Sequence, residues 1–269
     1  MEKTRELSIE EQQQILFEML KFYDEICRKE HLTYYLAYGT LLGAVREHGF
    51  IEWDDDVDVW MPREDYDKFN NTFSQYQNRK YFLQNYKTDK EFPIPEITRI
   101  CVNGTYKWPE GCEGNAFHTG MFIDIFPLDF GYGDKRDLKN LKKCAFYHGV
   151  LYSKTANAKT SPISFKRRLR RLVEQMIPSV VLRKRLMSLV EKSRGNNQHV
   201  FLSLGAAYAG ASRSLFDVSW FCKPVFLTFE NLQFPCPEMY EELLSYMYGP
   251  NYMIPQRTKI SRIKAYLMS

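Results

Sequence analysis

The chain has 269 residues, of which 44% are hydrophobic, 26% are charged and 15% are aromatic, and its net charge is +4. This composition is ordinary for a folded globular protein, excludes a low-complexity chain, and gives no reason to expect a nucleic-acid partner. The six cysteines form no C-x-x-C pair, and no apolar run reaches the length of a membrane span. We therefore expect reduced thiols in a cytoplasmic protein.

The N-terminal part predicts a helix, a strand and a short second helix. Ser8 and Glu11 have the spacing of a capping box, and two apolar series with a helical period continue to about residue 30. Residues 33–38 are rich in aromatics and are typical of a strand. Residues 40–46 fit a short helix, which His48-Gly49 ends.

Two short strands that carry acids follow. Residues 57–61 alternate in the manner of a strand, so that Asp56 and Asp58 project from the same face. Residues 121–126 form a second apolar stretch that a single acid, Asp124, interrupts. The segment between them, residues 87–119, contains several Pro and Gly and is predicted to be irregular.

The remaining pattern is mostly helical. Helices are predicted at residues 63–73, 135–154, 165–192 with a break near Pro178, and 238–248 with Gly249 as the cap. Residues 225–234 fit a strand or hairpin. Strands followed mainly by helices predict an α+β protein, in which one domain (1–269) combines a catalytic core with the metal site (1–130) and a mainly helical part facing the acceptor or membrane (131–269).

The acids predict a metal site. Asp56 and Asp58 alternate with valines on a strand that must be buried, so they need a functional reason. Together with Asp124 from a neighbouring strand, they could bracket the divalent cations that phosphoryl-type transfer requires. We expect Asp56, Asp58 and Asp124 to hold Mg²⁺ or Mn²⁺ and to be the catalytic residues. Asp54 and Asp55 are equally well explained as part of a solvated turn.

Four further residues are candidates for substrate binding. Gly39 and Thr40 offer a backbone that phosphate can approach and a hydroxyl that can bind it. Arg46 could neutralise the leaving phosphate, and a surface arginine on a short helix is its alternative. His118 could contact phosphate or substrate, and a loop histidine bonded to the backbone is the alternative.

Most of the chain, from about Tyr35 to Arg257, resembles the LicD family. The matching segments are residues 39–46, 50–58, 61–66, 122–129, 229–230 and 248–255. The block from 39 to 58 is long and specific. The C-terminal part departs from the family pattern, because Pro250-Asn251 stands where an acidic residue is expected after Tyr248-Gly249.

The resemblance implies both a fold and a reaction. The LicD family is similar to fukutin-type transferases and belongs with the nucleotidyltransferase-like fold, a mixed sheet flanked by helices. It gives the phosphate-binding turn to Gly39 and Thr40 and the metal-binding acids to Asp56, Asp58 and Asp124. Its best-known members transfer phosphocholine from CDP-choline to sugars of teichoic acids or lipopolysaccharide, and its fukutin-type relatives use CDP-ribitol. A CDP-alcohol donor and a glycan or lipid-linked polymer acceptor are therefore the implied partners, and CMP is the implied product.

A choline donor would require aromatic residues, because a quaternary ammonium group makes no ordinary hydrogen bonds and is recognised by aromatic faces. Trp53 is the candidate that we include in the site, and Trp60, Trp108 and Tyr106 are others near the motifs. Packing in the core is the alternative for each of them.

The basic charge is local. Residues 166–194 contain ten Lys and Arg but only two Glu, interleaved with apolar residues, so the rest of the chain is net acidic. This segment is either a helix with a solvated cationic face or a docking surface for anionic lipid or an anionic lipid-linked polymer. The second interpretation predicts a peripheral position at the inner face of the cell membrane.

Two other functions fit the same residues. One is a nucleotidyltransferase that acts on a small hydroxylated substrate and releases pyrophosphate instead of CMP. The other is an inactive protein that binds a glycan or a nucleotide. The presence of all three expected acids argues against the inactive protein.

Overall fold

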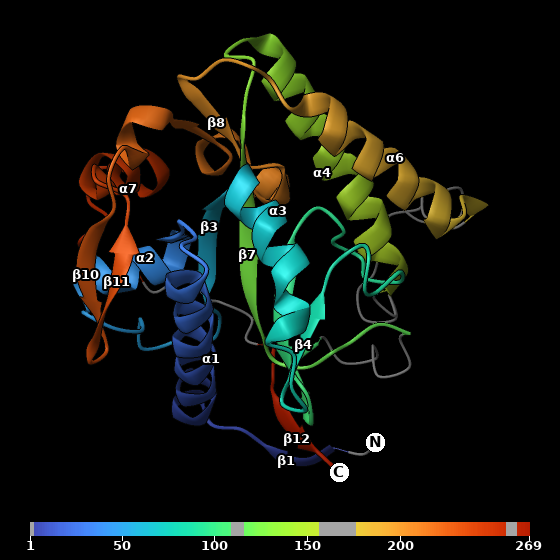
Figure 1. Ribbon diagram of the computed structural model, residues 1–269, viewed down its shortest axis with the longest axis vertical. Coiled ribbons are helices and arrows are strands. Elements are labelled where there is room, and N and C mark those ends of the chain that lie inside the picture. The colour runs from blue at the N-terminus through green and yellow to red at the C-terminus, as the bar shows by residue number, and fades with distance from the viewer. Residues whose placement is uncertain (1–2, 109–115, 156–175, 257–262) are drawn as a thin grey trace.

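The computed structural model describes residues 3–108, 116–155, 176–256 and 263–269 (Figure 1). Its centre is a seven-stranded mixed sheet. Five strands lie in the order β2 (Tyr35–Leu36), β3 (Asp58–Pro62), β7 (Phe122–Phe130), β5 (Thr98–Val102) and β4 (Tyr81–Gln84), with β8 (Val200–Leu202) paired to β7 and β9 (Leu215–Asp217) paired to β8. Only β3 and β7 run parallel in this sheet.

Helices flank the sheet, which confirms the predicted fold class. The α-helices are α1 (Ile9–Lys29), α2 (Tyr38–Arg46), α3 (Arg63–Thr72), α4 (Lys135–Thr155), α6 (Ser179–Ser193) and α7 (Tyr240–Tyr248). The 3₁₀ turns are η1 (Phe73–Gln75), η2 (Leu204–Ala209), η3 (Ala211–Arg213) and η4 (Val218–Phe221). In Figure 1, α1 and α3 lie in front of β3 and β7, and α4 and α6 form a separate pair beside them.

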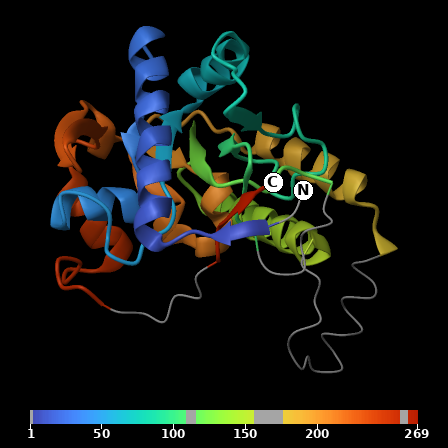
Figure 2. The same cartoon turned by 90° about the horizontal axis from the view of Figure 1, so that it is seen from below.

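Two small sheets complete the architecture. β10 (Val225–Phe229) and β11 (Leu232–Cys236) form a hairpin, as predicted. β1 (Lys3–Glu6), β12 (Tyr266–Met268) and β6 (Thr105–Tyr106) form a three-stranded sheet. Because β1 pairs with β12, the first and last described strands lie side by side, as the view from below shows (Figure 2).

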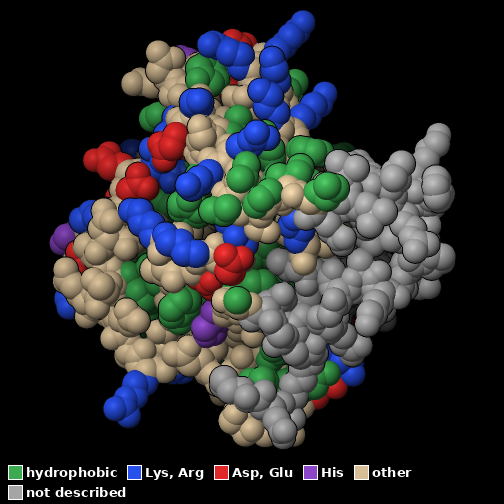
Figure 3. Space-filling model, turned by 90° about the vertical axis from the view of Figure 1, so that its right-hand side faces the viewer, with side chains coloured by type: hydrophobic (Ala, Val, Ile, Leu, Met, Phe, Trp, Pro, Cys, Tyr) green, Lys and Arg blue, Asp and Glu red, His purple; other side chains and the backbone are tan. Residues whose placement is uncertain are grey.

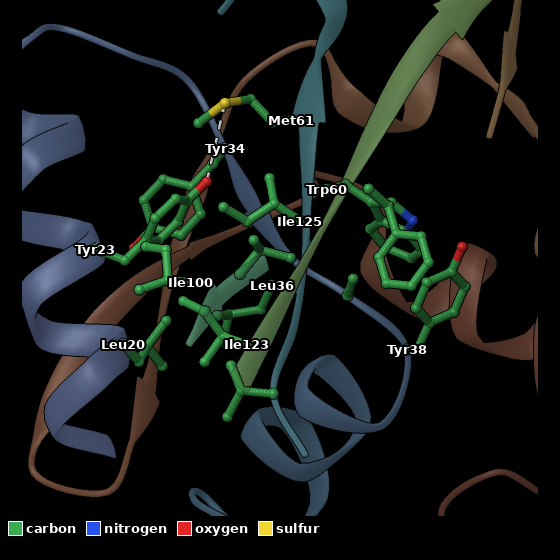
Figure 4. Packing of buried hydrophobic residues seen from close by; sticks show 14 of the residues in the cluster. Leu20, Tyr23, Tyr34, Leu36, Tyr38, Trp60, Met61, Ile100, Ile123 and Ile125 are labelled. Carbon is green, nitrogen blue, oxygen red and sulfur yellow. Dashed lines mark hydrogen bonds between the residues drawn. The ribbon is translucent and has the colours of Figure 1, made fainter. Parts of the chain in front are cut away.

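The capping box predicted for α1 is present. The Ser8 hydroxyl accepts a hydrogen bond from the backbone N–H of Glu11 at 3.2 Å, and the Glu11 carboxylate accepts one from the N–H of Ser8 at 2.9 Å. The apolar face of α1 is buried against the sheet: Figure 4 shows Leu20 and Tyr23 beside Ile123 and Ile125. Burial of this face covers one side of the sheet with apolar side chains.

The register of β3 and β7 gives the two faces of the sheet different chemistry. Asp58 lies opposite Asp124, and Trp60 lies opposite Phe126. Side chains alternate along a strand, so these four residues share the face that points away from α1. In Figure 4, Trp60 accordingly lies on the other side of the strands from the residues packed on α1.

Two expectations from the sequence need correction. The segment 87–119 is not irregular throughout, because it contains β5 and β6. Every residue of β5 is buried, so its sequence lacks the polar alternation that marks a strand with one solvent-facing side. A mainly helical C-terminal half is not clearly supported, because β8 to β12 accompany α4, α6 and α7 there.

The predicted helix 165–192 is described only in its second part. After Pro178 it forms α6, and the part before residue 176 lies outside the described residues.

A buried ion pair connects the sheet to α3. Asp129, at the end of β7, receives two hydrogen bonds of 2.7 Å from the guanidinium of Arg63, the first residue of α3. Arg194, just after α6, approaches the same carboxylate at 3.3 Å. Asp129 is 3% exposed, so its charge depends on these two arginines for compensation.

We predict that Asp129→Asn lowers the free energy of unfolding by about 3 kcal/mol, because it leaves two partly buried guanidinium groups without their carboxylate. Urea denaturation measures the effect. Asp67→Asn is the matched control, because Asp67 contacts Arg63 from an exposed position at 3.5 Å, and it should change stability by no more than about 0.5 kcal/mol. Equal losses in the two variants would contradict the prediction.

Candidate active site

A cavity of about 520 Å³ opens where the chain enters β3. Four acids line it: Asp54, Asp55, Asp56 and Asp58. Its other walls include seven aromatic and basic residues: Tyr38, Arg46, Trp53, Tyr208, Arg213, Tyr248 and Tyr252. This combination of carboxylates, cations and aromatic rings suits a ligand that contains phosphate, a metal ion and an organic group.

The sheet and α2 together position Asp58. Its backbone N–H donates to the Thr40 hydroxyl at 2.9 Å, and its carbonyl accepts from the N–H of Ala37 at 3.0 Å. On the other side, β3 pairs with β7 so that Asp58 and Asp124 are in register. The two carboxylates therefore emerge side by side from rigid strands.

A buried arginine neutralises Asp124. Arg99 lies opposite Asp124 in the β5–β7 pairing, and it donates to the two carboxylate oxygens at 2.5 and 3.2 Å. The guanidinium also lies 3.5 Å from the centre of the Phe122 ring. Arg99 is 5% exposed, and its second terminal nitrogen has no hydrogen-bond partner among the described residues. Asp124 is thus held in one orientation.

Asp54, Asp55 and Asp56 are half-buried and are not a solvated turn. Each offers a carboxylate oxygen, and the three oxygens lie within 4.8 Å of one another. The amide of Gln13 on α1 fixes this turn by donating to the carbonyl of Asp54 at 2.9 Å. The buried Lys107 donates to the carbonyl of Asp55 and lies 3.6 Å from its carboxylate.

Two glycines leave room for carboxylates that lie close to the backbone. A Cβ atom on Gly39 would lie 2.7 Å from a carboxylate oxygen of Asp54. A Cβ on Gly49 would lie 2.5 Å from the carboxylate of Glu230, which accepts a hydrogen bond from the N–H of Phe50 at 3.1 Å. Glu230, in the β10–β11 turn, therefore anchors the start of the segment that carries the acids. This explains structurally why residues 229–230 belong to the matching pattern.

The protein compensates the ionised forms of these acids poorly. Burial raises the pKa of Asp54 to about 8, and the neighbouring charge of Asp56 adds to this effect. Burial also raises the pKa of Asp56, and it raises the pKa of Asp58 well above its usual range. A divalent cation fits this set, because hard carboxylate oxygens converge on one cavity and their ionised forms are poorly compensated.

The structure brings most of the predicted site residues together. Gly39, Arg46 and Trp53 line the cavity with Asp56 and Asp58. The Arg46 guanidinium is held by the Glu47 carboxylate at 2.7 Å and by the carbonyl of Tyr252 at 3.3 Å, and its side chain is only 8% exposed. It is therefore part of the wall and not a surface arginine.

Three predicted residues lie outside the cavity lining. Thr40 is buried, and its hydroxyl is used by Asp58. Asp124 is directed to Arg99. His118 hydrogen-bonds the side chain of Asn103 at 2.8 Å and stacks on the Phe82 ring at 5.0 Å, so the structure gives it a local packing role.

Of the aromatic residues considered for a choline group, Trp53 lines the cavity. Trp60 is fully buried and packs edge-on against Phe216, and Trp108 and Tyr106 are also core residues.

Several residues of the site were not predicted from the sequence. Arg213 lines the cavity, and its guanidinium lies 4.5 Å from the centre of the Tyr248 ring. Within the described part of the chain no acid forms an ion pair with Arg213. Tyr208, on η2, also lines the cavity. The only earlier signal was the match at residues 248–255, which includes two of the aromatic walls, Tyr248 and Tyr252.

Comparison with known proteins matches residues 31–168, about half of the chain, to the family described as LicD/FKTN/FKRP, nucleotidyltransferase domain. The chain belongs to the LicD family. The matched residues include both acid-bearing strands, β3 and β7, and the complete Asp54–Asp58 turn.

A full-length relative supports this assignment. The lipopolysaccharide cholinephosphotransferase LicD of Haemophilus influenzae is 26% identical over 262 residues, which cover 93% of this chain and 94% of the relative. An uncharacterized protein of Rickettsia typhi is 33% identical over 137 residues, covering 51% of this chain and 41% of that protein. An uncharacterized protein of Rickettsia prowazekii is 35% identical over 133 residues, covering 49% and 46%. The first likeness therefore extends through the C-terminal half of this chain.

None of the helices in the described residues is both long enough and apolar enough to cross a membrane.

We predict that Asp54→Asn stabilises the metal-free protein as pH rises. The raised pKa means that the unfolded chain loses its Asp54 proton near pH 4, whereas the folded protein keeps it to about pH 8. The wild type therefore loses stability across this interval, and the Asn variant lacks that loss. The free energy of unfolding of Asp54→Asn should exceed that of the wild type only slightly near pH 4 and by at least about 1 kcal/mol at pH 8.

Urea denaturation in EDTA at both pH values tests this expectation. Asp134→Asn is a suitable control, because Asp134 is exposed and paired with Arg136, and it should show no gain at the higher pH. A constant difference between wild type and Asp54→Asn at the two pH values would refute the argument.

Proposed function

We propose that this protein transfers a phospho-alcohol group, phosphocholine from CDP-choline, to a sugar hydroxyl of a cell-surface glycan precursor and releases CMP. The observation that carries the proposal is the cavity in which Asp54, Asp56 and Asp58 converge, in a chain of the LicD family. The full-length relative named a lipopolysaccharide cholinephosphotransferase supports phosphocholine as the group and a glycan as the acceptor. Teichoic acid and lipopolysaccharide precursors both belong to this class of acceptor.

The transfer is an in-line substitution at phosphorus. The glycan hydroxyl oxygen forms a bond to the distal phosphorus of the donor, the bond from that phosphorus to the bridging oxygen breaks, and CMP leaves with the electron pair. The hydroxyl proton passes to a carboxylate. Asp54 is better placed for this step than Asp124, because Asp54 lines the cavity whereas both oxygens of Asp124 receive hydrogen bonds from Arg99.

Mg²⁺ or Mn²⁺ is the implied cofactor, and Asp56 and Asp58, with Asp54 beside them, would hold it, while Asp124 completes the acidic set behind them. When bound, the cation supplies positive charge that stabilises the charge developing on the phosphate oxygens. The protein contributes fixed cations of its own. Arg213 and Arg46 line the same cavity and are placed to orient the donor phosphates and the departing CMP.

A nucleotidyltransferase that acts on a small hydroxylated substrate is the second candidate, favoured by the description of the matched domain. The same carboxylates would serve either reaction. The products distinguish them, because the transferase yields CMP from a CDP-alcohol and the nucleotidyltransferase yields pyrophosphate from a triphosphate.

We predict that Asp58→Asn lowers the rate of CMP release from CDP-choline on the order of 10³-fold, because it removes a carboxylate from the charge-stabilising set. The assay measures CMP with Mn²⁺ and a glycan acceptor, and circular dichroism checks the fold. Asp134→Asn, at a position that does not line the cavity, should retain the wild-type rate. Near-normal transfer by folded Asp58→Asn would overturn the mechanism, and pyrophosphate release from CTP in place of CMP release would favour the second candidate.

We predict that Trp53 contributes to recognition of the choline group. Trp53→Leu should lower kcat/KM for CDP-choline roughly tenfold through loss of a cation–π contact, and it should affect the uncharged donor CDP-glycerol much less. Trp220→Leu is the matched control, because Trp220 packs on Tyr246 and does not line the cavity. An equal loss with both donors would show that Trp53 serves packing alone.

A further inference from the structure

A second, larger concavity of about 1070 Å³ lies between α4 and α6, and the carboxylate site does not use it. We refer to it as the α4–α6 groove. Seven of its lining residues are cations: Lys135, Lys139, Lys142 and Lys143 on α4, and Lys184, Arg185 and Lys192 on α6. Its apolar lining includes Leu138, Phe146 and Val181, which are 43%, 47% and 36% exposed.

The cations of the groove are not neutralised by the helices that carry them. Asp137 is the only acid of α4, and it is buried, accepting hydrogen bonds from the N–H groups of Tyr132 and Gly133. Glu191 is the only acid of α6, and it pairs with Arg194 at 3.1 Å. Within the described residues, no acid lines the groove and none forms an ion pair with its seven cations.

The exposed apolar residues are not needed to join the two helices. α4 and α6 already share a core that is formed by residues such as Leu141, Val150, Leu182 and Leu186. Tyr147 and Leu189 of the groove lining pack against this core, whereas Leu138, Phe146 and Val181 are not part of it. On the face drawn in Figure 3, Lys and Arg side chains lie next to hydrophobic ones in the upper part of the molecule.

We propose that the α4–α6 groove is a docking site for an anionic lipid bilayer. Cations attract the phosphate headgroups, and each one near such a surface strengthens binding. The apolar strip between them matches the acyl region just below the headgroups, and the lysine stems can reach past it to the headgroup level. An anionic polymer in solution would use the cations but would leave the apolar strip exposed, so the combination favours lipid.

The groove is connected to the active site through α4. Helical spacing places Lys139 and Lys142 on the groove side and Cys144 and His148 on the opposite side. Cys144 contacts the carbonyl of Leu204 on η2, and the His148 ring lies 5.2 Å from that of Tyr208, which lines the cavity. A docked bilayer would therefore lie about one helix diameter, roughly 10 Å, from a wall of the cavity.

Vesicle sedimentation with the full chain tests the proposal. Wild type should bind phosphatidylcholine–phosphatidylglycerol vesicles and should not bind phosphatidylcholine alone. The triple variant Lys139→Glu, Lys143→Glu, Lys184→Glu should lose binding roughly 100-fold. The charge-matched control Lys87→Glu, Lys90→Glu, Lys223→Glu changes exposed lysines elsewhere and should lose far less.

A second pair of variants tests the apolar strip. Leu138→Ser with Val181→Ser should weaken vesicle binding several-fold, whereas Phe226→Ser with Leu232→Ser, on the exposed β10–β11 hairpin, should not. Circular dichroism confirms that each variant is folded. Equal losses of binding in the two charge variants would overturn the proposal, and so would equal binding of the wild type to neutral and anionic vesicles. The proposal would also be overturned if the groove variants lost binding to inorganic polyphosphate but kept binding to vesicles. These readouts do not involve transfer, so they stand apart from the test of the proposed function.

Discussion

The burial of neighbouring carboxyl groups, together with their mutual repulsion, is the constraint on which the rest of this structure depends. Asp54, Asp56 and Asp58 converge on one cavity, and burial raises the pKa of each. In an isolated peptide these side chains would rotate outward and become exposed to solvent. Here parallel pairing of β3 with β7 and the hydrogen bond from Asp58 to the Thr40 hydroxyl hold the chain in place. The unfavourable burial of these carboxyl groups is therefore maintained by strand pairing and by the apolar core beneath, and the groups become available for binding a cation.

Positive charge is distributed in two layers around these acids. Arg99 and Lys107 are buried beneath or beside the site, where they pair with Asp124 and Asp55. Arg46 and Arg213 lie in the cavity wall, where a ligand can reach them. The buried layer fixes the orientation of individual carboxylates but leaves Asp54, Asp56 and Asp58 undercompensated. The arrangement fits a ligand that brings a metal ion to the carboxylates and phosphate oxygens to the wall arginines.

The sequence predicted the parts of this site that depend on short-range pattern. The alternation around Asp58 and the single acid in residues 121–126 predicted two strands that carry acids, and the structure places Asp58 and Asp124 in register. β5 was missed, because burial on both faces removes the alternation. The role of Arg99 depends on the pairing of β5 with β7, which are separate in the sequence. The role of Thr40 depends on a hydrogen bond from the backbone N–H of Asp58. Neither contact is visible in composition or spacing. Tyr208 enters the site from η2 and Arg213 from η3, and these turns have no periodic signal.

The two faces of α4 explain why a single helix carries so many lysines. Its inner face must be apolar and closely packed, because it supports η2 and therefore a wall of the cavity. Its outer face has no such requirement, and solubility alone would be met by mixed charges that pair along the helix. Instead its four groove lysines face the cations of α6 across exposed Leu138 and Phe146, and like charges at this spacing repel one another. Such an arrangement costs stability in the free protein, and an anionic surface removes that cost by neutralising both helices together.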